Sequence, residues 1–168
     1  MKAQDFMDMI STSALLELVN KGDMERIKYL IDHGLDINKQ SKYGETMLAR
    51  AVKTNATDIA TYLIKAGANV NIPVFELASS GACKCNKYSL LCKVAYHDKS
   101  AAILKELIAN HPELNIHEVD HRGNSILDYA IRGQNQKAIE LLVKLGAKTN
   151  SYNLSNFNNN DITLAQEV

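Results

Sequence analysis

The sequence predicts an all-α protein, a solenoid of stacked helix–turn–helix units joined by extended loops. Three observations predict this architecture. A short block recurs four times in the 168 residues, an apolar stripe at helical spacing runs into each copy, and a shorter apolar segment precedes each stripe. Because one helix pair cannot cover its own apolar face, the repetition favours a stack in which neighbouring units bury one another.

The recurring block ends each unit in asparagine. Its copies are LIDHGLDIN (30–38), LIKAGANVN (63–71), LIANHPELN (107–115) and LVKLGAKTN (142–150). The offsets between the terminal asparagines are 33, 44 and 35 residues. We predict a helix over each stripe, ended by a left-handed glycine at Gly34, Gly67 and Gly146. In the third copy His111-Pro112 replaces the glycine, and proline stops the helix by a different route.

The shorter segments read ALLELV (14–19), MLARAV (47–52), LCKVAY (91–96) and ILDYAI (126–131). A polar joint of a few residues connects each to its stripe, which predicts a tight turn between two helices. We therefore predict an N-terminal extension over 1–12 and a single domain over 13–168. Within it lie units at about 13–41, 42–72, 85–116 and 120–150, an insertion loop over 73–88 and a half-unit or cap over 158–168.

Composition sets limits on the function. Apolar residues make up 46% of the chain and charged residues 23%, as in ordinary globular proteins. Nineteen basic residues balance nineteen acidic ones, so net charge favours neither nucleic acid nor an anionic membrane as a partner. No apolar run reaches the roughly 18 residues of a membrane span, and the first residues do not resemble a signal peptide. Three cysteines are too few for a disulfide scaffold, which predicts a reducing, cytoplasmic compartment.

Two stretches carry a family resemblance. KYGETML (42–48) and DHRGNSIL (120–127) are similar to the D-x-x-G-x-T-P-L motif of ankyrin repeats, and the endings GLDIN, GANVN and GAKTN match as well. The 33-residue offset is the period of that family. The sequence thus resembles an ankyrin-repeat protein over roughly residues 13–165, least in the third unit.

The sequence departs from this family at the Thr-Pro-Leu-His motif, where proline and histidine are missing. We assign the histidine position to Leu16, Ala49, Lys93 and Asp128. The resemblance implies that this histidine ties neighbouring hairpins together. We therefore expect a less stable stack than that of a consensus array.

All three cysteines lie in the stretch GACKCNKYSLLC (81–92). Alignment on Asn115 puts Cys92 where the second and fourth units have Leu48 and Leu127, which predicts a small buried hydrophobe. Cys83 and Cys85 are one residue apart and lack a second pair, unlike a structural zinc site, so we predict no metal. A metal- or redox-sensing module that uses these two thiols remains an alternative hypothesis.

No residue pattern predicts catalysis. His97-Asp98 and Asp120-His121 are adjacent in sequence, and adjacent side chains rarely form a working dyad. Cys92, with His97 as base, is predicted to be buried. The glycines are scattered at turns, so no phosphate-binding loop is present. We expect no enzymatic activity, no catalytic residues and no cofactor.

The resemblance implies a binding face on the concave side of the stack, made of loop tips and the exposed face of each shorter helix. The predicted protein-binding residues are Lys42, Tyr43, Glu45, Lys53, Lys87, Tyr88, His97, Asp98, His121, Arg122, Asn124 and Arg132. This set is richer in basic and aromatic groups than the neutral chain, so it favours an acidic protein surface as partner.

The leading hypothesis is a non-catalytic protein–protein interaction module, monomeric, with neither nucleic acid nor a membrane as partner. The degenerate repeats and Asn-, Lys- and Ile-rich usage resemble ankyrin proteins of low-GC, host-associated bacteria. That resemblance implies a bacterial effector that binds a host protein, located in the cytoplasm or delivered into a host cell. An intracellular inhibitor or immunity protein that blocks an enzyme or toxin is the alternative.

Overall fold

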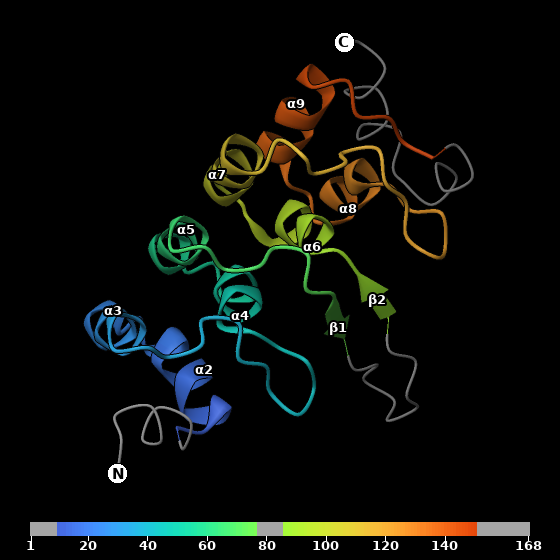
Figure 1. Ribbon diagram of the computed structural model, residues 1–168. Coiled ribbons are helices and arrows are strands. Elements are labelled where there is room, and N and C mark those ends of the chain that lie inside the picture. Colours follow the sequence, from blue (N-terminus) through green and yellow to red (C-terminus); the bar gives the residue numbers. More distant parts are fainter. Residues whose placement is uncertain (1–9, 77–85, 151–168) are drawn as a thin grey trace.

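The computed structural model describes residues 10–76 and 86–150, and in these ranges eight helices form four stacked pairs (Figure 1). The pairs are α2 (Thr12–Lys21) with α3 (Met24–Asp32), α4 (Met47–Lys53) with α5 (Thr57–Lys65), α6 (Leu90–His97) with α7 (Ala102–Asn110), and α8 (Ile126–Arg132) with α9 (Gln136–Lys144). The first helices of the pairs form one row and the second helices another, with the connecting loops beside the first row (Figure 1). This arrangement confirms the predicted all-α solenoid.

A short β-hairpin lies in the connection between the second and third pairs. Strands β1 (Val74–Glu76) and β2 (Asn86–Tyr88) pair antiparallel, with Val74 opposite Tyr88. The hairpin extends from the loop side of the stack, within the predicted insertion 73–88 (Figure 1). Cys83 and Cys85, most of the predicted extension 1–12 and the predicted cap 158–168 lie outside the described residues.

Each first helix begins at a hydroxyl side chain that caps it. The oxygens of Ser11, Thr46, Ser89 and Ser125 each accept a hydrogen bond from the backbone N–H three residues later. Such a bond satisfies one of the N–H groups that a helix start leaves without a partner. In α8 the cap is reciprocal, because Asp128 accepts from the Ser125 backbone N–H at 2.7 Å.

The second helices end as their sequences predict. Gly34, Gly67 and Gly146 adopt φ angles of 93°, 85° and 80°, in the left-handed region where other residues are strained. Helix α7 instead ends at Asn110, directly before His111-Pro112. All four pairs contribute to one continuous apolar core.

The stripe leucines show how the pairs bury one another. Leu63, Leu107 and Leu142, at equivalent positions of α5, α7 and α9, are fully buried. Burial of one leucine side chain stabilises the folded state by about 1.5–3 kcal/mol. Packing of these side chains in the stack therefore contributes substantially to stability.

The third and fourth pairs approach each other closely at Asn135 and Gly133. The Asn135 amide is buried, and its Nδ2 donates to the carbonyl oxygens of Ala95 and Asp98, both at 2.8 Å. Gly133 lies against the Tyr96 backbone, and a Cβ at this position would come 2.9 Å from Tyr96 Cα and overlap its carbonyl oxygen. One side chain thus satisfies carbonyls at the C-terminal end of α6, and only a residue without a side chain fits beside it.

The third pair differs from the predicted register by one residue. Three residues after each cap lie Ala49 in α4, Cys92 in α6 and Asp128 in α8, so these positions are equivalent. It is Leu91 that matches the leucines at the second positions of α4 and α8.

The predicted equivalence of Cys92 with Leu48 and Leu127, and of Lys93 with the histidine position, was therefore wrong. The reason lies in the connections. From the cap to the start of the second helix there are 13 residue steps in the third pair and 11 in the second and fourth. The stretch from α7 to Asn115 is one residue shorter than its counterparts, so the two differences nearly cancel in an alignment on the asparagines.

Cys92 is nevertheless buried, as predicted, with 2% of its surface exposed. Ser89 Oγ donates to its sulfur at 3.4 Å. Burial raises the pKa of the Cys92 thiol to about 11, and the nearby carboxylates of Glu118 and Asp120 act in the same direction. The thiol therefore stays protonated at neutral pH and packs as a small apolar side chain.

Replacement Gly133→Ala should lower the free energy of unfolding by about 3 kcal/mol, because the new methyl group meets backbone atoms that cannot rotate away. Gly22→Ala is the matched control. Its Cβ meets nothing within 4 Å, so only the left-handed backbone costs stability there, about 1 kcal/mol. Urea unfolding followed by circular dichroism measures both, and equal losses would contradict the close approach of the third and fourth pairs.

In a Cys83→Ser/Cys85→Ser background, the remaining Cys92 thiol should react with a chromogenic disulfide reagent only slowly at pH 8. About one thiol in a thousand is ionised at that pH, and the sulfur is covered. Denaturing urea should accelerate the reaction at least a hundredfold. A native rate similar to that of a free thiol would show instead that Cys92 is a reactive group.

Candidate functional site

The predicted binding residues come from two kinds of place. Some lie on the loops before the first helices, and others lie at the C-terminal ends of α4, α6 and α8. Lys87 and Tyr88 lie on β2, and their side chains are outside the described part of the structure. The structure describes the side chains of the other predicted binding residues.

A groove of about 360 Å³ separates α2 from the loop that leads into α4. Tyr43 borders it with 55% of its surface exposed, and the Lys42 ammonium lies 4.8 Å from the centre of the Tyr43 ring. Glu45 is partly buried and paired with Arg50, with 2.6 Å between Oε2 and Nη2. Arg50 balances the Glu45 charge, and the exposed side chains that line this groove include Lys42, Tyr43 and Glu17.

The loop before α8 presents His121 and Arg122 at the surface. Arg132, at the end of α8, is also exposed, and its Nη2 donates to Asn124 Oδ1 at 2.6 Å. Asn124 itself is buried, and its Nδ2 donates to Asp120 Oδ2 at 2.7 Å. The prediction that Asn124 contacts a partner was therefore wrong, since its amide is enclosed and holds Arg132 in place.

The prediction that Asp98 contacts a partner was also wrong, because Asp98 is completely buried. Its Oδ1 accepts from the Ser100 hydroxyl at 2.8 Å and its Oδ2 from the Leu104 backbone N–H at 2.9 Å. The carboxylate thus closes the long turn between α6 and α7. It neither reaches a partner nor serves as the acidic member of a dyad with His97.

Tyr96 is the residue that the sequence analysis missed. It is 41% exposed and lies seven residues after its helix cap, as do Lys53 and Arg132 in the neighbouring pairs. His97, which was predicted in this role, is partly buried and packs edge-on against the Tyr96 ring at 4.8 Å between centroids. Alignment of the pairs on their hydroxyl caps would have found Tyr96.

Within residues 10–76 and 86–150, no group of three or more His, Cys, Asp and Glu side chains is placed to hold a metal ion. The sensor hypothesis concerns Cys83 and Cys85, which lie outside these ranges, and it stays a prediction. In the same ranges, no helix has the length and apolar character needed to cross a membrane.

Known proteins resemble the chain in sequence. A family model described as ankyrin repeats (3 copies) matches residues 3–74. A Rickettsia felis protein named as an ankyrin repeat protein is 28% identical over 131 residues, which are 77% of this chain and 39% of that protein. One from Acanthamoeba polyphaga mimivirus is 38% identical over 56 residues, 33% of this chain and 35% of that protein. The chain thus spans well under half the length of either relative. The stacked helix pairs and these matches support an ankyrin-repeat family for the chain.

Proposed function

We propose that the chain binds another protein through its concave face, which we define as the α2, α4, α6 and α8 row with the loops beside it, and that it has no catalytic activity of its own. Ankyrin repeats generally mediate protein–protein interactions. The observation that carries the proposal is the exposed Tyr43 beside the groove between α2 and the next loop. Exposed tyrosines next to a recess are frequent anchors of interfaces.

The charges of the concave face favour an acidic partner. Lys53, Tyr96 and Arg132 occupy the same position in three successive pairs, so they follow one line along the stack. Lys42 adds a positive charge at the edge of the Tyr43 groove. The chain as a whole carries no net charge, so these cations would provide the attraction for an acidic partner.

Two roles would use this face. The first is that of an effector that binds a host protein in the host cytoplasm, as the composition suggests. The second is that of an inhibitor or immunity protein that covers the active site of an enzyme or toxin. The roles differ in where the partner is found, so capture from animal-cell lysate and from bacterial lysate separates them.

A Tyr43→Ala/Lys53→Ala variant should bind the captured partner at least tenfold more weakly than the wild type, because it removes an aromatic anchor and a charge from the concave face. Tyr29→Ala/Lys105→Ala is the matched control, with an equally exposed tyrosine and lysine on the outer helices α3 and α7. Affinity capture with mass spectrometry identifies the partner, and surface plasmon resonance then compares the two variants.

Raising the salt concentration should slow association with an acidic partner, since screening weakens the attraction between unlike charges. A partner that the control variant loses and the Tyr43 variant keeps would place the interface on the outer helices. Such a result would refute the proposal.

A further inference from the structure

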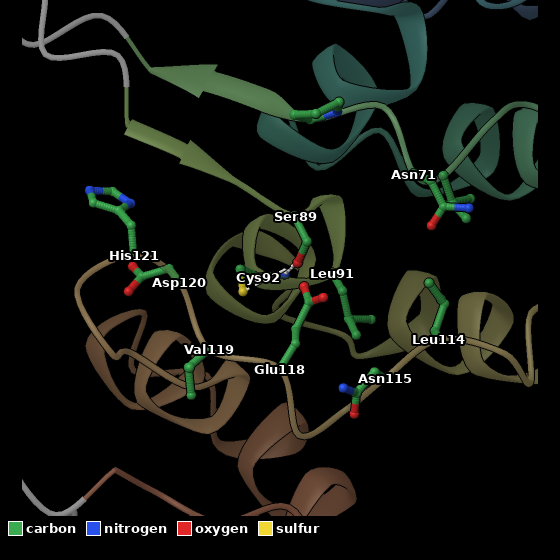
Figure 2. Close-up of a pocket in the computed structure, with 12 residues that line it drawn as sticks. Asn71, Ser89, Leu91, Cys92, Leu114, Asn115, Glu118, Val119, Asp120 and His121 are labelled. Atoms are coloured by element: carbon green, nitrogen blue, oxygen red, sulfur yellow. Dashed lines mark hydrogen bonds between the residues drawn. The ribbon is translucent and has the colours of Figure 1, made fainter.

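A second groove, of about 330 Å³, lies over the N-terminal end of α6 (Figure 2). It runs between the loop that leads into β1, which contributes Val70, and the loop after α7, which contributes Leu114 and Val119. Ser89 and Leu91 form its base (Figure 2). This volume is at the lower end of the range for small-ligand sites, so it admits one long side chain.

Two neighbouring loops beside the groove lack a hydrogen bond that joins an earlier pair of loops. Between the first and second pairs, the Asn69 backbone N–H donates to Asn38 Oδ1 at 2.7 Å and ties one loop to the next. The equivalent residues one pair further are Glu113 and Asn71, and no hydrogen bond links them in the described structure. The one-residue shortening after α7 and the inserted hairpin both belong to the two loops at this junction.

The groove is acidic. Glu118 reaches into it towards Ser89 and Leu91 (Figure 2), and its carboxylate makes no hydrogen bond or ion pair within residues 10–76 and 86–150. Asp120 also lines the groove, but Oδ2 of its carboxylate accepts from the Tyr129 hydroxyl at 2.7 Å. Among the lining residues only His121 can carry a positive charge. Glu118 is therefore an available negative charge in a recess.

The remaining walls are apolar. Leu91 and Leu114 line the groove beside Glu118, and Val119 stands at its edge with 55% of its surface exposed. An isolated carboxylate next to aliphatic walls complements a side chain with an apolar stem and a cationic end. Lysine and arginine are the two side chains of that kind.

We propose that this groove binds a lysine or arginine side chain from an extended segment of the partner protein, with the stem along Leu91, Leu114 and Val119 and the cation at Glu118. The proposal rests on the proposed function in one respect, namely that the partner is a protein. It adds a specific requirement: a partner that is acidic opposite Tyr43 and Lys53 presents a basic residue opposite α6. The positive charges near Tyr43 and the Glu118 carboxylate lie at different places along the stack. The partner can therefore match both only in one orientation.

The test is a titration of the ¹⁵N-labelled chain with three short probes, acetyl-Leu-Arg-Leu-amide, acetyl-Leu-Lys-Leu-amide and acetyl-Leu-Glu-Leu-amide. The arginine and lysine peptides should shift the amide signals of residues 70–72, 89–92 and 114–119 with a dissociation constant of about 1 mM. The glutamate peptide should leave them unchanged. Glu118→Gln should weaken binding of the basic peptides about fivefold, as expected for a partly exposed ion pair.

Glu113→Gln is the matched control, because Glu113 lies on the same loop, is 61% exposed and does not line the groove. Its affinity for the basic peptides should equal that of the wild type. The Tyr43→Ala/Lys53→Ala variant should also bind them normally, so that failure of the groove and failure of the concave face give different results.

Three outcomes would overturn the proposal. The first is no shift of the groove signals at about 10 mM of either basic peptide. The second is an equal shift with the glutamate peptide, which would make the groove an apolar site without charge selection. The third is a shift of the same signals on concentrating the chain alone, which would assign the groove to a second copy of the protein.

Discussion

The structure depends on the burial of each helix pair against its neighbours. No single pair covers its own apolar face, so Leu63, Leu107 and Leu142 are enclosed only because the pairs stack in sequence order. Helix caps and left-handed glycines fix the shape of one pair, and packing joins the pairs into one core. The loops beside the first row add Leu35, Ala68, Val70 and Ala147 to this core. Their exposed parts carry the hairpin, the exposed tyrosine and the acidic groove.

The sequence predicts the helix pairs well because helical periodicity and terminal glycines are local properties. The register of the third pair could not be predicted from local patterns. Two extra residues in one connection and one fewer in another nearly cancel, so alignment on Asn115 moves Cys92 by one position and hides Tyr96. Asp98 and Asn124 look like surface residues in the sequence, yet both are buried because they accept or donate hydrogen bonds that close turns. Only the structure shows whether such polar residues face solvent or the backbone.

The position that holds histidine in the family motif has diverged in the second, third and fourth pairs. Ala49 and Cys92 fill it with apolar groups, whereas Asp128 keeps a polar one. Asp128 Oδ2 accepts from Ser125 and from the Asn150 backbone N–H, at 3.4 Å, so it ties α8 to the following loop. The side chain at this position therefore makes apolar contacts in some pairs and hydrogen bonds in another. The groove over α6 lies at a junction where no hydrogen bond between Asn71 and Glu113 joins the loops in the described structure.

The bridge made by Asn135 has a consequence for the order in which the chain acquires its structure during translation. The carbonyl groups of Ala95 and Asp98 at the end of α6 find their donor 37 to 40 residues later in the chain. The ribosome releases the third pair before the side chain that completes it, and domains form from the N-terminus as they emerge. Until Asn135 has been synthesised, these two carbonyl groups lack the donor that the folded stack gives them, so the end of α6 is completed by a later part of the chain.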